Sequence, residues 1–243
     1  MLKQFYEKSA LWFAIGWIIA YCVLFSVGDA LSAMVGLEKS VTLAVGLLLS
    51  AVVWIFLKKN RLTKAYGLCP PQVPAKAVLW YLPLLLLLTA NLWFGVKLNY
   101  GAAETVLYIL SMFCVGFLEE VLFRGLLFEA MRKESPKAAV IVSSITFGIG
   151  HIINLFNGSG AELLPNLLQV VYATAAGFMF VLLYCRTKSL LACIITHSVF
   201  NALSVFAVDA PTLPLKILTC GLLTLISAGY ALYLKMKISQ PAG

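Results

Sequence analysis

Long apolar runs recur along almost the whole sequence, and they constrain the fold more than any other feature. A run of roughly 18 or more apolar residues can cross a bilayer as a helix, because a helix satisfies its backbone groups internally. About eight such runs are present, over residues 10–31, 40–57, 76–96, 103–130, 136–156, 164–185, 189–208 and 214–235. Only 12% of the 243 residues are charged, too few for a soluble domain of this size. The sequence predicts an all-α polytopic membrane bundle of about eight transmembrane helices.

Basic residues gather on one side of the predicted spans. The side that holds both termini carries Lys3, Lys8, Lys58, Lys59, Arg61, Lys64, Arg132, Lys133, Lys137, Arg186, Lys188, Lys235 and Lys237. The opposite loops carry Asp29, Glu38, Lys39, Lys97, Glu104, Glu162 and Asp209. The positive-inside rule therefore places both termini in the cytoplasm, and an even number of spans agrees with this.

The formal net charge of +8 has the same explanation, because cytoplasmic loops beside anionic lipid are normally basic. The basic segment 57–64 lacks interleaved aromatic residues and adjoins a span, so we expect the lipid bilayer as its partner and no nucleic acid. The proline-rich connector 67–76 is typical of a cytoplasmic loop and not of a domain boundary. We therefore expect residues 1–243 to form a single membrane-embedded domain.

The stretch GFLEEVLFRGLLF, residues 116–128, places charges inside an apolar span. On a helix, Glu120 and Arg124 share a face at i and i+4 and can form an ion pair, whereas Glu119 is displaced by about 100° around the axis. One carboxylate is thus left without a partner. Both glutamates could merely satisfy neighbouring polar groups, but a charge in hydrocarbon costs about 2.5–3.5 kcal/mol or more and usually marks a functional interior.

The two histidines of the chain also lie in predicted spans. His151 ends the segment FGIGH, and His197 opens HSVFN, which places Asn201 one turn later on the same face. A single histidine on an apolar helix is more often a packing residue than a ligand. Here, however, both histidines and the Glu-Glu-Arg cluster occupy separate spans that can converge in a bundle.

These side chains suit the hydrolysis of a peptide bond. An unpaired Glu119 can remove a proton from water and return it to a leaving amine, while an imidazole holds the water. His197 and Asn201 can donate hydrogen bonds to an oxyanion. The sequence has no H-E-x-x-H and no G-x-S-x-G motif, so zincin and serine mechanisms have little support.

The same residues resemble a known family. EEVLFR at 119–124 is similar to its E-E-x-x-x-R motif, FGIGH at 147–151 to F-x-x-x-H, and HSVFN at 197–201 to H-x-x-x-N. The chain resembles the CPBP intramembrane proteases (ABI family), which include type II CAAX prenyl endopeptidases and bacteriocin-processing enzymes. All three motifs fall in a catalytic core at about residues 103–208 of this chain.

The resemblance implies a role for each motif residue. Glu119 would be the base that activates water, His151 would share the water, and Glu120 with Arg124 would support them. His197 and Asn201 would stabilise the oxyanion. Zinc bound by Glu119, His151 and His197 is one reading, since three protein ligands and an open position are typical of catalytic zinc. We favour a water held by glutamate and histidine without a metal.

Other functions stay open at this point. A proton-coupled transporter could use the same glutamates and histidines as a relay, although no inverted repeat is visible. A non-catalytic immunity or accessory protein would not need the motif residues. For a protease, we expect a membrane-associated or lipidated peptide or protein as substrate. The compact chain favours a prokaryotic cell membrane.

Overall fold

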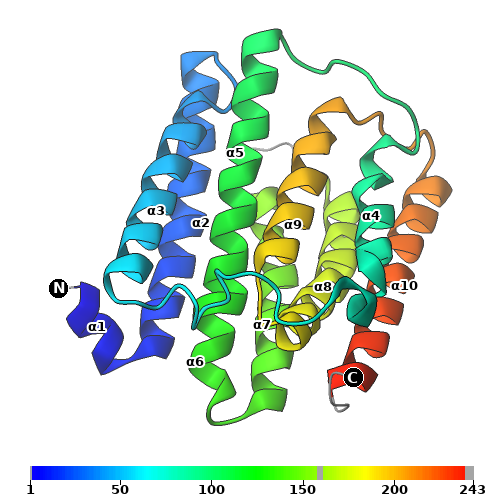
Figure 1. Cartoon of the computed structure of the whole chain (residues 1–243). Coiled ribbons are helices and arrows are strands. Elements are labelled where there is room, and N and C mark those ends of the chain that lie inside the picture. The colour runs from blue at the N-terminus through cyan, green and yellow to red at the C-terminus, as the bar shows by residue number, and fades with distance from the viewer. Residues whose placement is uncertain (1, 158–160, 239–243) are drawn as a thin grey trace.

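The computed structural model describes residues 2–157 and 161–238, and this part of the chain is mainly helical. Its elements are α1 (Leu2–Lys8), α2 (Ala10–Val35), α3 (Ser40–Lys59), η1 (Ala75–Tyr81), α4 (Leu82–Leu88), η2 (Ala90–Leu92), α5 (Ala102–Glu120), η3 (Val121–Leu127), α6 (Phe128–Arg132), α7 (Pro136–Gly150), η4 (His151–Leu155), α8 (Leu163–Thr187), α9 (Leu191–Leu203), η5 (Ser204–Phe206) and α10 (Leu213–Ile238). The described residues contain no strand, only an isolated bridge between Val96 and Ala207. The all-α membrane bundle is confirmed (Figure 1).

Seven helical segments of the described chain are long and apolar enough to cross a membrane. The fourth is the longest, because α5, η3 and α6 follow one another without a break over Ala102–Arg132. The seventh predicted span, 189–208, is a shorter apolar helix over Leu191–Phe206. The sequence therefore indicated the order of the spans correctly but overestimated the length of this one.

The predicted third span, 76–96, is not a continuous α-helix. A 3₁₀ segment, η1, precedes α4, and Leu79, Trp80 and Tyr81 have φ values of 52°, 48° and 59°. Such left-handed conformations are unusual for side chains of this size. Pro83 lies in the first turn of α4, where its missing N–H costs nothing, so a new helix begins there.

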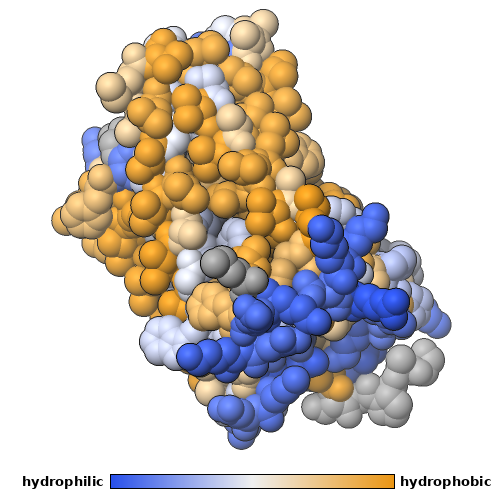
Figure 2. Space-filling view, turned by 90° about the vertical axis from the view of Figure 1, so that its left-hand side faces the viewer, coloured by the Kyte–Doolittle hydropathy of each residue, from blue (hydrophilic) through white to orange (hydrophobic). Residues whose placement is uncertain are grey.

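The two ends of the bundle differ in charge. In Figure 1, α1 and the end of α10 lie at the lower end, together with the 60–74 loop and the α6–α7 and α8–α9 connections. All lysines and arginines except Arg124, Lys39, Lys97 and Lys216 belong to this end, which we call the basic end. Figure 2 shows the hydrophilic residues gathered there, below an apolar surface that suits lipid.

Two pairs of helices approach each other closely where glycines face the partner. A Cβ atom on Gly116 of α5 would lie 2.7 Å from the backbone nitrogen of Ser198 in α9. A Cβ atom on Gly148 of α7 would lie 2.9 Å from the Cα atom of Thr174 in α8. Small residues allow this approach in membrane helices. The contacts fix the relative positions of the helices that carry the motif residues.

Gly116→Ala should lower the melting temperature in detergent. The added methyl group meets the backbone of α9, so the helices must move apart, and overpacking of this kind costs about 1–3 kcal/mol. Gly221→Ala in α10 is the matched control, because a Cβ atom there meets nothing within 4 Å. Equal melting temperatures for the two variants would contradict the close α5–α9 contact.

Candidate active site

The Glu-Glu-Arg cluster lies where α5 passes into a π-helical segment, η3. Glu119 and Glu120 end α5, and Arg124 lies in the middle of η3. The side chains of Glu120 and Arg124 are 0% exposed, whereas that of Glu119 is 13% exposed. Wide π-helical turns occur often at functional sites. The two adjacent carboxylates thus have different surroundings, as their angular separation on a helix predicts.

Arg124 is held by one carboxylate and by aromatic rings. Its Nη1 atom donates to Glu120 Oε1 at 3.1 Å. Its guanidinium carbon lies 3.9 Å from the ring centroid of Phe147 in α7 and 5.6 Å from that of Phe180 in α8. Cation–π contacts of this kind are worth about 2 kcal/mol or more when desolvated. The arginine therefore links three helices inside the bundle.

His197 of α9 lies between the two glutamates. Its Nδ1 atom is 2.9 Å from Glu120 Oε1, and its Nε2 atom is 3.5 Å from Glu119 Oε2. Because an ionised carboxylate can only accept, we assign the proton to Nδ1, which donates to Glu120. Nε2 then faces Glu119. Four of the six predicted site residues, Glu119, Glu120, Arg124 and His197, thus form one connected group.

Glu119 has one occupied and one unoccupied oxygen. Oε1 accepts a hydrogen bond of 2.6 Å from the hydroxyl of Tyr21 in α2. Oε2 is buried and has no hydrogen-bond partner among the described residues. A buried carboxylate oxygen without a partner is costly and calls for a ligand or water. Tyr21 therefore orients Glu119 so that Oε2 is available.

His151 follows the last residue of α7 and begins η4. Its Nδ1 atom lies 3.1 Å from the carbonyl oxygen of Phe147, which can only accept, so we assign the proton to Nδ1. The buried Asn166 of α8 donates to the backbone carbonyl of His151 at 2.9 Å and so fixes the end of α7. Nε2 of His151 consequently carries a lone pair.

Glu119, His151 and Asn201 line one cavity of about 350 Å³. Asn201 lies one turn after His197 on α9, as predicted, but its side chain makes no hydrogen bond to the other five site residues in the described structure. A smaller, mainly apolar cavity of about 70 Å³ lies beside it, and both histidines and Asn201 line that cavity as well. The six predicted residues thus surround one region of the bundle.

The three candidate metal ligands have suitable chemistry but not the required spacing. Glu119, His151 and His197 each present a lone pair, and the carboxylate of Glu120 behind His197 is typical of the surroundings of a metal-bound histidine. No group of three or more His, Cys, Asp or Glu in the described chain is placed to hold a metal ion. In this arrangement the residues do not fit a three-ligand zinc site.

Sequence reasoning assigned no role to two residues that shape the site. Tyr21 contacts Glu119 from the first span, far from the motifs, and no sequence pattern marks it. Phe147 begins the FGIGH motif, and its ring lies 5.2 Å from that of His151 and 5.5 Å from that of His197. Its spacing of four residues before His151 is the signal that could have identified it.

The fold and the site together define a polytopic membrane protein with a polar, titratable site buried among its helices. Residues 101–203 match the family described as type II CAAX prenyl endopeptidase Rce1-like, which confirms the resemblance for the region that holds all six predicted site residues. The chain is also similar to a Bacillus subtilis (strain 168) protein named "Putative membrane peptidase YdiL", with 32% identity over 100 residues. That match covers 41% of this chain and 36% of the relative, so it spans about a third of the relative's length. No solved structure matches the chain significantly.

Arg124→Ala should lower the melting temperature in detergent, because it leaves the carboxylate of Glu120 uncompensated in a dry interior. Breaking a buried pair in this way costs about 3–5 kcal/mol. The double variant Glu120→Gln with Arg124→Met removes both charges and should recover part of the loss. If Arg124→Ala melts like the wild type, or if the double variant is no more stable than Arg124→Ala, the pair does not stabilise the bundle.

Proposed function

We propose that the protein is an intramembrane endopeptidase that hydrolyses a peptide bond of a membrane-associated or lipidated peptide or protein. The observation that carries the proposal is the buried, unpartnered Oε2 atom of Glu119 at the wall of the cavity. A carboxylate held in this way can act as a general base. The family match and the similarity to a protein named as a membrane peptidase support the same reaction class.

The reaction begins with a water molecule between Glu119 and His151. Glu119 Oε2 takes a proton from the water, and the lone pair on His151 Nε2 accepts a hydrogen bond from it. The water oxygen attacks the carbonyl carbon of the substrate. When the C–N bond breaks, Glu119 returns the proton to the leaving nitrogen, so the products are a carboxylic acid and an amine. Glu119 is ready for the next cycle.

The oxyanion of the intermediate needs hydrogen-bond donors. The amide of Asn201 can donate without a change of protonation. His197 already donates through Nδ1 to Glu120, so a second donation through Nε2 requires an imidazolium ion. His197 Nε2 lies 3.5 Å from Glu119 Oε2, on the side of the ring that faces the catalytic carboxylate. Asn201 and His197 can therefore act together at the oxyanion, as the resemblance implies.

The competing functions have less support in the structure. A transporter opens its site to each end in turn, and neither the family match nor the similarity to a protein named as a membrane peptidase supports that function. A non-catalytic immunity or accessory protein would not require Glu119 to keep an unpartnered oxygen. Cleavage assays on variants of Glu119 distinguish these functions from the proposed one.

Glu119→Gln should reduce cleavage of a membrane-anchored reporter peptide at least about a hundredfold, because the amide keeps the shape of the side chain but cannot take the proton. Its melting temperature should stay near that of the wild type, since the ion pair of Glu120 is untouched. Glu134→Gln, the same change at an exposed loop position, is the control. Tyr21→Phe should give an intermediate loss, because it removes only the hydrogen bond that orients Glu119. Full activity of purified Glu119→Gln would refute its role as the base.

The proposed reaction uses no metal, and the metal content of the purified protein can be measured. Purified protein treated with a chelator and then dialysed should cleave the reporter peptide at the untreated rate. Elemental analysis of the same sample should find less than one zinc per chain. Activity that is lost on chelation and restored by zinc would instead assign Glu119, His151 and His197 to a metal centre.

A further inference from the structure

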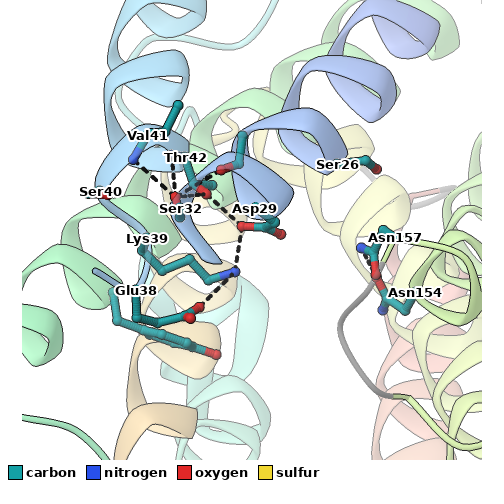
Figure 3. Close-up of polar contacts among 12 residues, drawn as sticks. Ser26, Asp29, Ser32, Glu38, Lys39, Ser40, Val41, Thr42, Asn154 and Asn157 are labelled. Atoms are coloured by element: carbon teal, nitrogen blue, oxygen red, sulfur yellow. Dashed lines mark hydrogen bonds and ion pairs between the residues drawn. The ribbon is translucent and has the colours of Figure 1, made fainter. Parts of the chain in front are cut away.

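A charged cluster joins the end of α2 to the start of α3 at the end of the bundle opposite the basic end. Asp29 Oδ1 accepts hydrogen bonds from Lys39 Nζ at 2.7 Å and from Thr42 Oγ1 at 2.6 Å. Lys39 Nζ also lies 3.7 Å from Glu38 Oε1. Figure 3 shows this cluster, with Ser32 linking the same two helices. Its function is not explained by the reaction at Glu119.

The cluster is only partly covered by protein. The side chains of Lys39 and Asp29 are 14% and 25% exposed. Burial alone would lower the pKa of Lys39, but the charge of Asp29, its hydrogen bond and the smaller contributions of Tyr108 and Glu38 together raise the pKa above its ordinary value. An ion pair of this kind needs water or a polar ligand beside it, because lipid would not solvate the parts of the charged groups that the protein leaves uncovered.

The charged cluster and the catalytic glutamate line the same cavity. On α2, the lining runs from Tyr21, which holds Glu119, through Ser26 to Asp29, about 12 Å along the helix axis. Asn154 and Asn157 line it from the opposite side, and Figure 3 shows them facing α2 across the cavity. The wall of the cavity is therefore polar at the end near Asp29, which we call the outer end. Glu119 lies at the opposite, inner end.

Toward the basic end, the helices below Glu119 are tightly packed. Leu122, Leu126 and Phe128 are all between 0% and 2% exposed. They occupy the part of the fourth span that continues from Glu119 to the basic end. A peptide that reaches Glu119 from that side would have to displace this core, whereas the polar cavity already leads to Glu119 from the other side.

We infer that the substrate is a membrane-anchored polypeptide whose cleaved segment lies on the non-cytoplasmic side and enters past Asp29 and Lys39. The basic end faces the cytoplasm by the positive-inside rule, so the polar end of the cavity faces the opposite compartment. This inference rests on the proposed function, because only an enzyme has a substrate. The direction in which the cavity opens does not depend on catalysis. A cytoplasmic peptide tail is not the substrate class that the geometry favours.

The test is labelling with a membrane-impermeant maleimide, with modified cysteines identified by peptide mass spectrometry. The Ser26→Cys variant places a thiol in the cavity, and native Cys69, in the loop at the basic end, serves as an internal reference in the same molecule. In vesicles that expose the non-cytoplasmic face, position 26 should be labelled and Cys69 spared. In inverted vesicles, Cys69 should be labelled and position 26 spared.

Val23→Cys is the matched control, because Val23 is 53% exposed on α2 but does not line the cavity. It faces lipid, so a water-soluble reagent should not label it from either side. The inference is overturned if position 26 is labelled from the same side as Cys69, or if neither vesicle type labels position 26 while detergent-denatured protein is labelled there. These outcomes need no turnover, so they are distinct from a failure of the Glu119→Gln test.

Discussion

The buried pair of Glu120 and Arg124 is the interaction on which the rest of the structure depends. Hydrophobic burial does little to drive helices together within a bilayer, so packing and polar contacts between helices decide their arrangement. The guanidinium of Arg124, on the fourth span, contacts Phe147 of α7 and Phe180 of α8. The carboxylate of Glu120, which pairs with Arg124, also forms a hydrogen bond with His197 of α9. This ion pair thus contacts four helices, and moving α7, α8 or α9 would remove a cation–π contact of Arg124 or the hydrogen bond between His197 and Glu120.

This arrangement separates the tasks of two adjacent carboxylates. Glu120 does not line the large cavity; its Oε1 atom is bonded by Arg124 and His197, Arg124 compensates its negative charge, and its Oε2 atom is buried without a hydrogen-bond partner among the described residues. Glu119, one residue earlier, points toward the cavity and keeps an oxygen without a partner. The difference arises from helical geometry, because neighbouring residues on a helix face different directions. The chain can therefore stabilise its fold with one glutamate and leave the other available for chemistry.

Much of the fold and site was predictable because it depends on patterns along one helix. The apolar runs gave the order of the spans, and the i,i+4 spacing gave the Glu120–Arg124 pair. Contacts between helices distant in sequence left no such pattern. The hydrogen bond from Tyr21 to Glu119 depends on how α2 packs against α5, and the contact of His197 with both glutamates depends on how α9 does. The π-helical turns of η3 also have no sequence signal that we recognised.

Three irregular segments of the fold have a common physical cause. Backbone that departs from a regular α-helix at membrane depth is tolerated where it is buried in protein or lines a polar cavity, since lipid cannot satisfy its free groups. Three short 3₁₀ segments, η2, η4 and η5, each contribute a polar side chain to the large cavity, namely Asn91, Asn154 and Ser204. The seventh span is short because α9 passes into η5 at this cavity. These three departures from the predicted helices therefore occur where the bundle makes room for water and, in the proposed reaction, for a peptide.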